Sequence, residues 1–358
     1  MSLRPLKNLF LIVYAVSSLV YASNKDNDDL LAKRLLPLAS GTFWQIGSER
    51  LHRWSDAELA AEVRVLKEMG IEFLIIHYTA YWSQVSNSYD TVVPDMPFRA
   101  YDFLTNRNPL DAIFRAAEIE GVQVIIGDFL VPPNIRYERP EEALGHWLSG
   151  EAMDFRRAII TRYKDSPSFY GYYIANEPNP HNITSPAYES LWRQSTKEVV
   201  TFVKSLKPEL QIIHSIGLYP EWINGMPYAP SDAYLDRFWR PWVEEIDEID
   251  TWMLIDGVGT SLSSHAHTAK AQKWAQKVAH EYNKEYWVDV ENAKMTNEFV
   301  PFHIAQLKRS LEIAAQTADK IVLFEHLSYM SPNSEKEAAV KLYTDYLDYR
   351  AKIMDRKH

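Results

Sequence analysis

Two glutamates, Glu177 and Glu291, have the residue type and the setting for acid–base chemistry on a shared substrate. Glu177 follows the apolar run SFYGYYIAN, and Glu291 follows the run EYWVDV. If these runs are parallel strands of one closed sheet, their ends open on the same mouth, where residues distant in sequence converge. Two carboxyl groups at one mouth suit glycoside hydrolysis, in which one attacks or orients while the other gives and takes a proton.

The elements that would position these glutamates alternate along the chain. Extended or apolar runs typical of strands buried on both faces are separated by amphipathic patterns typical of helices. The strict alternation predicts an α/β fold, a single-domain (β/α)₈ TIM barrel. An open doubly wound sheet is the alternative, but Trp44-Gln45-Ile46-Gly47 stands where that fold has a glycine-rich phosphate turn. The predicted strands cover residues 41–47, 71–80, 122–130, 168–178, 211–218, 250–260, 285–293 and 320–330.

The predicted helices lie between and after these strands. Several begin at a residue that favours a helix start, such as Ser55 or Asn108-Pro109. The long stretch between the second and third strands, residues 81–108, is predicted to be irregular and rich in aromatic residues, and it would form one wall of a substrate cleft. The predicted helices cover residues 55–70, 109–121, 142–165, 185–208, 232–247, 267–284, 301–319 and 335–354.

Composition excludes some classes of partner. The chain of 358 residues carries 38 Lys and Arg against 48 Asp and Glu, a net charge of −10, with no basic run. Nucleic acid is therefore not an expected partner. The sequence has no HExxH motif, no calcium-loop pattern and no GxSxG motif, so we expect neither a metal nor another cofactor, and no serine nucleophile.

The first 22 residues resemble a secretory signal peptide. Arg4 and Lys7 precede an apolar stretch of 14 residues that ends in Val20-Tyr21-Ala22, the pattern a signal peptidase accepts. Because this stretch is shorter than the ~20 residues that span a bilayer, we expect cleavage, a secreted or periplasmic protein and no stable membrane insertion. An uncleaved anchor is the alternative. A linker over residues 23–38 and a catalytic barrel domain over residues 39–354 would follow.

Each glutamate also has an ordinary structural interpretation. Glu177 could cap the next helix or pair with an arginine such as Arg193. Glu291 could form a salt bridge within the barrel mouth. In the alternating WVDVEN run, Asp289 and Glu291 share a face, and Asp289 would lie deeper in the barrel. Glu291 is the better exposed candidate.

The order of motifs resembles a known clan. Asn176-Glu177-Pro178 at the end of the fourth strand, with Glu291 at the end of the seventh, is similar to the retaining glycoside hydrolases of clan A. That resemblance implies Glu177 as acid/base, Glu291 as nucleophile and Asn176 as a partner of the sugar 2-hydroxyl group. A closer resemblance, over residues 38–350, is to bacterial glycosidase-like barrels known only as a domain of unknown function. It rests on GTFWQ, GYY, Asp256-Gly257-Val258-Gly259, WVDVE and HLSYMSP.

The chain departs from these patterns at two places. Ile255 stands where the closer family usually has glutamine before Asp256. Phe324-Glu325-His326 stands where clan A barrels commonly present a tryptophan beneath the sugar. Glu325 and Asp256 therefore remain rivals to Glu291 as the second carboxyl group.

Other residues are candidates for sugar binding. Tryptophan rings stack on sugar faces, and polar groups at strand ends bind hydroxyl groups or hold a glutamate in place. The predicted substrate contacts are Asn176, Trp44, Trp82, His214, Trp222, Asp256 and Glu325; His77, Asp128 and His326 are further polar residues at predicted strand ends.

These observations predict a secreted, monomeric glycoside hydrolase that cleaves a poly- or oligosaccharide with retention of configuration. Its two carboxyl groups would lie ~5–5.5 Å apart. Two alternatives remain: a non-catalytic carbohydrate-binding barrel of an exopolysaccharide system, and a transglycosylase that uses the same carboxylates.

Overall fold

The computed structural model describes most of the predicted barrel domain. The predicted signal peptide lies outside the described residues, as does the linker up to residue 34. Cleavage and export therefore stay predictions. The described residues are 35–45, 54–83, 88–91, 93, 99–100, 108–131, 139–178, 185–217, 222–223, 226–227, 232–295 and 299–356.

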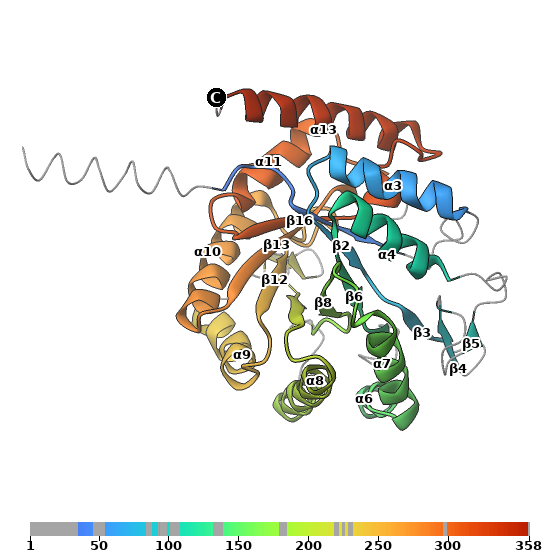
Figure 1. Ribbon diagram of the computed structural model, residues 1–358. Helices are drawn as coiled ribbons and strands as arrows, with labels where there is room; N and C mark the ends of the chain where they lie inside the picture. The colour runs from blue at the N-terminus through green and yellow to red at the C-terminus, as the bar shows by residue number, and fades with distance from the viewer. Residues whose placement is uncertain are drawn as a thin grey trace, which may run out of the picture. The chain divides into compact units, whose positions relative to one another are not determined.

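Eight parallel strands close into a barrel (Figure 1). Closure is made by β1 and β16, where Gly41 pairs with Val322, and β1 pairs with β2 on its other side. The prediction of a (β/α)₈ barrel is confirmed, and the open sheet is excluded. In barrel order the strands are β1 (Gly41–Trp44), β16 (Lys320–Phe324), β13 (Glu285–Glu291), β12 (Thr251–Ile255), β9 (Gln211–Ile216), β8 (Phe169–Ile174), β6 (Gln123–Gly127) and β2 (Phe73–Ile76).

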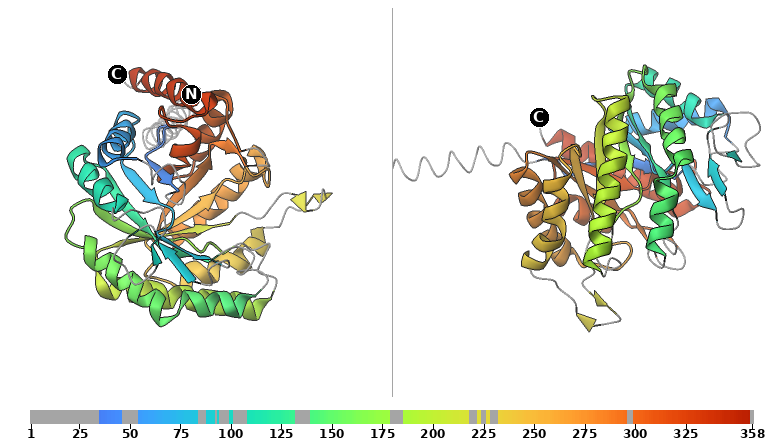
Figure 2. Two further views of the ribbon diagram at one scale, coloured as in Figure 1. Left: turned by 90° about the vertical axis from the view of Figure 1, so that its right-hand side faces the viewer. Right: turned by 90° about the horizontal axis from the view of Figure 1, so that it is seen from below.

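Helices surround these strands (Figure 2). The predicted starts at Ser55 and Asn108 are confirmed, because each side chain accepts a hydrogen bond from the backbone of the helix that it caps. The predicted helix over residues 142–165 is two helices. The first ends at Trp147, and Ser149 caps the second by accepting a hydrogen bond from the Ala152 N–H. The helices are α3 (Asp56–Glu68), α4 (Pro109–Glu120), α6 (Pro140–Trp147), α7 (Gly150–Tyr163), α8 (Pro186–Leu206), α9 (Asp232–Glu245), α10 (His265–Glu281), α11 (Ile304–Ala314), α12 (His326–Tyr329) and α13 (Glu337–Asp355).

Short strands extend from the carboxyl ends of the barrel strands. The stretch predicted to be irregular contains β3 (Ala80–Ser83), β4 (Ser88–Thr91) and β5 (Arg99–Ala100). They join β7 (Phe129–Leu130) in a separate sheet of order β5-β4-β3-β7. That part of the prediction was wrong, because β3 gains its partner β7 from a segment about 50 residues away. Two further pairs are β10 (Trp222–Ile223) with β11 (Met226–Pro227), and β14 (Ala293–Lys294) with β15 (Val300–Pro301).

The barrel interior is filled by side chains from alternate strand positions, as expected of a small closed barrel. Trp287 belongs to this inner cluster, so the row that continues through Asp289 to Glu291 faces inward and rises toward the mouth. The buried members of the cluster are Phe43, Phe73, Ile75, Ile125, Tyr173, Ala175, Ile213, Met253, Trp287 and Val322.

A fully buried ion pair fastens α7 to the end of β6. Arg156 donates two hydrogen bonds of 2.9 Å to the carboxylate of Asp128. Tyr172 and Trp147 donate to the same carboxylate at 2.8 and 2.7 Å. Asp128, predicted as a ligand for hydroxyl groups or as a satisfied buried group, is thus engaged by protein donors.

We expect Arg156→Ala to lower the free energy of unfolding by about 3–5 kcal/mol, because it leaves a buried carboxylate without its counter-charge. The matched control is Arg162→Ala in the same helix, whose pair with Asp111 has side chains 34% and 31% exposed. That pair should contribute at most about 1 kcal/mol. Urea denaturation of both variants measures the difference, and equal losses would contradict the expectation.

Candidate active site

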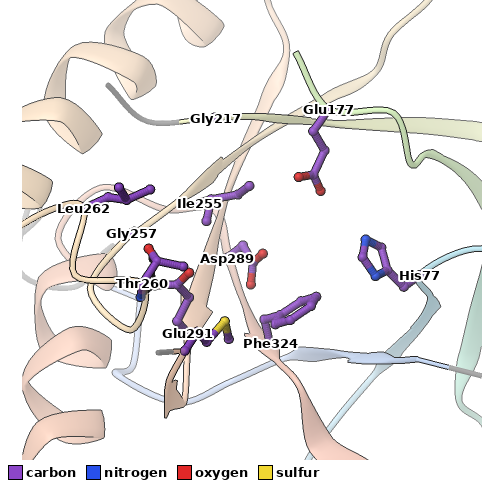
Figure 3. Close-up of a pocket in the computed structure, with 11 residues that line it drawn as sticks. His77, Glu177, Gly217, Ile255, Gly257, Thr260, Leu262, Asp289, Glu291 and Phe324 are labelled. Carbon is purple, nitrogen blue, oxygen red and sulfur yellow. Dashed lines mark hydrogen bonds between the residues drawn. The ribbon is translucent and has the colours of Figure 1, made fainter. Parts of the chain in front are cut away.

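A pocket of about 230 Å³ opens at the carboxyl ends of the barrel strands (Figure 3). Its described lining contains three carboxyl groups and one imidazole, and no lysine or arginine. The barrel thus brings together residues that are more than 200 positions apart. The lining residues are His77, Glu177, Gly217, Ile255, Gly257, Thr260, Leu262, Asp289, Glu291, Met295 and Phe324.

Glu177 lies just after β8 and faces the pocket (Figure 3). The hydroxyl group of Tyr173, four residues earlier on β8, donates a hydrogen bond to Glu177 Oε1. Ser215 on β9 lies 2.9 Å from the same phenol. Because a phenol has a single proton, the Ser215 hydroxyl donates to Tyr173 while Tyr173 donates to Glu177. Burial, and then the charge of Glu177, raise the pKa of Tyr173 well above its usual range, so this donor keeps its proton.

Arg193 does not form the ion pair with Glu177 that was considered as a structural role for this glutamate. It forms ion pairs with Glu189 and Glu245 on the helical side of the barrel. Neither Tyr173 nor Ser215 was predicted as a site residue. The alternation of β8 and β9, which turns both side chains inward, is the sequence signal that would have found them.

Glu291 ends β13 on the same pocket. Its Oε2 accepts a hydrogen bond of 2.9 Å from the backbone N–H of Thr260, and the Thr260 hydroxyl lies 3.4 Å away. Burial raises the pKa of Glu291 to about 7, although the hydrogen bonds from Thr260 oppose the shift. Gly259 permits this contact, because a Cβ there would lie 2.1 Å from the Ala293 carbonyl oxygen and 2.9 Å from the Glu291 Cβ.

Asp256 lies behind Glu291 and outside the pocket lining. Its Oδ1 accepts hydrogen bonds from the backbone N–H groups of Val258 at 3.1 Å and Glu291 at 3.3 Å. Burial, followed by the charge of Glu291, raises the pKa of Asp256 well above its usual range. This predicted substrate contact therefore fixes the backbone from which Glu291 projects.

Asp289 lines the pocket, although it was expected only deeper in the barrel. It lies one inward position before Glu291, and Figure 3 shows its carboxyl group turned toward the space between Glu177 and Phe324. Burial, and then the charges of Glu177, Asp256 and Glu291, raise the pKa of Asp289 well above its usual range. The alternation of the WVDVEN run placed Asp289 on the correct face. The expectation that Glu291 is the better exposed of the two was wrong, because both residues are 3% exposed.

His77, at the end of β2, faces the carboxyl groups from across the pocket (Figure 3). Its ring packs edge-on against Phe43 and Phe324, with centroids 5.5 and 5.4 Å away. The Gln45 amide lies 3.4 Å from His77 Nδ1. Phe324 stands at the position where a tryptophan was expected, so an aromatic ring remains part of the pocket lining.

Family comparison supports the sequence resemblance. Residues 39–336 match the model of the family described as Domain of unknown function (DUF4434). The chain belongs to this family. Among curated protein sequences, none matches the chain.

Solved structures similar to this DUF4434 barrel are named for carbohydrate enzymes. A proposed alpha-L-fucosidase from Bacteroides thetaiotaomicron superposes with a TM-score of 0.70 at 20% identity, over 88% of this chain and 94% of that chain. The endo-beta-1,4-mannanase from Thermotoga petrophila gives 0.58 at 16% identity, over 89% and 77% of the two chains. The endo-1,4-beta-mannanase from Rhizomucor miehei gives 0.54 at 14% identity, over 88% and 95%. At these identities the likeness shows the fold.

The DUF4434 barrel leaves several predicted contacts outside the pocket lining. Asn176 is fully buried, and its amide accepts from the Val131 N–H and donates to the Phe129 carbonyl, both at 2.9 Å. Trp44 is also fully buried and stacks on His326 with centroids 6.4 Å apart. These residues pack the wall of the barrel. Trp82 and Trp222 belong to β3 and β10, but their side chains lie outside the described residues.

Two other polar residues at strand ends also have structural partners. His214 points away from the barrel interior and packs between Trp242 and Trp252, and burial lowers its pKa to about 3, so it is neutral. Glu325 is fully buried and caps α12 by accepting hydrogen bonds from the backbone N–H groups of Leu327 and Ser328 at 3.0 and 2.6 Å. That cap removes Glu325 from the pocket as a rival to Glu291.

His326 forms a buried pair with Glu62 on α3, and Asn333 donates to the same glutamate at 2.7 Å. Among the described residues, no group of three or more His, Cys, Asp or Glu side chains is arranged to hold a metal ion. Over the same residues, no helix has the length and apolar character needed to cross a bilayer.

Proposed function

We propose that this protein is a secreted glycoside hydrolase that cleaves O-glycosidic bonds of a poly- or oligosaccharide with retention of configuration. One observation carries the proposal: Glu177, just after β8, and Glu291, at the end of β13, line the same pocket. Asp256 and Glu325 lie outside its described lining and accept hydrogen bonds from backbone N–H groups. The likeness of the fold to mannanases and to a proposed fucosidase supports it.

In the proposed mechanism, Glu291 attacks the anomeric carbon while Glu177 protonates the leaving glycosidic oxygen. A covalent glycosyl-enzyme forms, and Glu177 then removes a proton from water as the water attacks the same carbon. Tyr173 and Ser215 orient Glu177, and the Thr260 N–H orients Glu291. A separation of ~5–5.5 Å between the two carboxyl groups stays a prediction of this mechanism.

The size of the pocket bears on how much substrate it holds. Its 230 Å³ lies below the roughly 300–1,000 Å³ of pockets that enclose drug-sized ligands. We infer that it encloses one sugar unit, while neighbouring units contact residues farther out on the mouth. Trp82 and Trp222 remain proposed stacking partners for those units.

A substrate screen tests the proposal. The purified protein without residues 1–22 is incubated with a panel of polysaccharides and aryl glycosides, and NMR identifies the first anomer released. Release of the anomer of the substrate supports retention, and release of the opposite anomer contradicts it. Sugar binding without turnover by a folded protein would favour the carbohydrate-binding barrel. Faster product formation in the presence of an added acceptor sugar would favour the transglycosylase.

The pKa of Glu291 predicts how activity depends on pH. Because its pKa is raised to about 7 and only the ionised carboxylate attacks, the acid limb of the kcat/KM profile should rise with pH through an inflection near 7. Thr260→Val removes the nearby hydroxyl but keeps the backbone donor, so the inflection should move to higher pH. An unchanged inflection in this variant, or one below pH 5 in the wild type, would contradict the assignment.

Export is the remaining part of the proposal. We expect the protein recovered from the periplasm or the medium to begin near residue 23, because the predicted cleavage site follows Ala22. Amino-terminal sequencing measures this directly. Recovery of a cytoplasmic protein that still begins at Met1 would show that the segment is not a signal peptide.

A further inference from the structure

Asp289 is a carboxyl group in the pocket that the proposed mechanism does not use. Its side chain is only 3% exposed, yet its Oδ1 has no hydrogen-bond partner among the described residues. Native proteins seldom leave a buried polar atom unpaired, and Asp289 Oδ1 is the one such atom among the described residues that belongs to the pocket lining. An unpaired group that lines a pocket is available to a ligand.

The surroundings of Asp289 are acidic. Glu177 at the end of β8, Asp256 at the end of β12 and Glu291 on its own strand all act on its carboxyl group, and His77 faces it across the pocket. The described lining contains no lysine or arginine. Burial and these three acidic neighbours therefore favour the neutral acid over the carboxylate.

A neutral carboxylic acid has a hydrogen-bond donor as well as acceptors, whereas a carboxylate only accepts. A sugar hydroxyl group has the same double character, so the two can pair in either direction. A charged uronic acid, in contrast, would bring a fourth carboxyl group into a pocket whose described lining has no lysine or arginine. The geometry thus suits a hydroxyl group on an uncharged sugar.

We propose that Asp289 is a substrate-binding residue that donates a hydrogen bond to a hydroxyl group of an uncharged sugar unit held between Glu177 and Glu291. This inference rests on the proposed function. It adds a residue that selects the substrate to the two residues that carry out the chemistry. A site built to bind a hydroxyl group rejects analogues that lack it much more strongly than an apolar pocket rejects a missing methylene group.

Thermal stability tests the neutral form without any substrate. A carboxyl group with a raised pKa contributes stability at low pH that is lost as the pH rises through its folded pKa, and asparagine has no such loss. The melting temperature of Asp289→Asn, relative to wild type, should therefore increase from pH 4.5 to pH 8.5. Asp154→Asn, at an exposed position of α7, sets the baseline for the chemical change. The same pH dependence in both variants would overturn the neutral form.

Kinetics tests the contact. The substrates are para-nitrophenyl glycosides of glucose, galactose, mannose, fucose, xylose and glucuronic acid. For the sugar that wild type cleaves, Asp289→Asn should keep kcat/KM within about threefold, because the amide also donates, and Asp289→Leu should lose at least about tenfold. Asp289→Ala replaces the leucine variant if that variant does not fold. An equal loss in the asparagine and leucine variants would overturn donation by the neutral acid.

Saturation-transfer NMR with the same six free monosaccharides separates failure of this inference from failure of the proposed function. Turnover by wild type with no loss in Asp289→Leu overturns the inference and leaves the hydrolase intact. Binding by wild type without turnover removes the hydrolase, and binding at least about tenfold weaker in Asp289→Leu still supports the contact. A protein that cleaves only the glucuronide overturns the preference for an uncharged sugar. A wild type that neither binds nor cleaves any of the six sugars overturns the inference, whereas turnover on the panel of polysaccharides decides the hydrolase.

Discussion

Glu177→Gln should lower kcat by about 10²–10⁴-fold on a glycoside with a poor leaving group, such as a methyl glycoside, because the leaving oxygen then departs without a proton. With a dinitrophenyl glycoside of the same sugar, the loss in the bond-breaking step should be much smaller, since that leaving group needs little protonation. The comparison uses one sugar and one variant, so it is insensitive to modest changes in folding. Initial rates on the two substrates measure it.

The substitution keeps the shape of Glu177 and its capacity to accept the hydrogen bond from Tyr173. Tyr173→Phe is the matched variant: it removes the donor but keeps the carboxyl group, so it should disturb the pH profile more than the leaving-group dependence. Equal losses of Glu177→Gln on the two substrates would show that Glu177 is not the proton donor.

Glu291→Ala should abolish turnover of the same substrates, with a loss on the order of 10⁴-fold or more. The neighbouring carboxyl group in the pocket, Asp289, is favoured as the neutral acid, which does not attack the anomeric carbon. Azide is small enough to enter the space left by the side chain and to attack the anomeric carbon directly. Added azide should therefore restore product formation as a glycosyl azide of the opposite anomeric configuration. NMR of the product identifies it.

Glu325→Gln is the control for Glu291→Ala, because Glu325 was the rival second carboxyl group. We expect it to lower the melting temperature through a weaker cap on α12, while kcat stays within about tenfold of wild type. Loss of activity in a folded Glu325→Gln variant, with activity retained in Glu291→Ala, would reverse the assignment of the nucleophile.

The barrel could be predicted from the sequence because each of its strands is buried on both faces. A parallel strand of this kind is a continuous apolar run, and the surrounding helices carry a separate amphipathic period. The break between α6 and α7 could not be predicted in the same way. Helical periodicity continues through Leu148-Ser149-Gly150, and the break depends on the cap that Ser149 makes.

The convergence of Glu177 and Glu291 could likewise be predicted, because it follows from the order of the strands. The roles of their neighbours could not. Glutamate is not among the residues that favour a helix N-cap, so nothing local to Glu325 indicated its use on α12. His214 and Trp44 do lie near the predicted strand ends, but neither side chain reaches the pocket. Whether a side chain at a strand end faces the pocket depends on the tilt and stagger of the strands in the closed barrel.

Asn176 fixes the position of the backbone at the barrel mouth. Its two amide hydrogen bonds hold the chain at Phe129 and Val131, directly beside the residue that precedes Glu177. Both bonds are made to backbone atoms, so they do not depend on the side chains at these two positions. The placement of the proposed proton donor thus depends on the backbone of residues 129–131, so their side chains can vary without moving it.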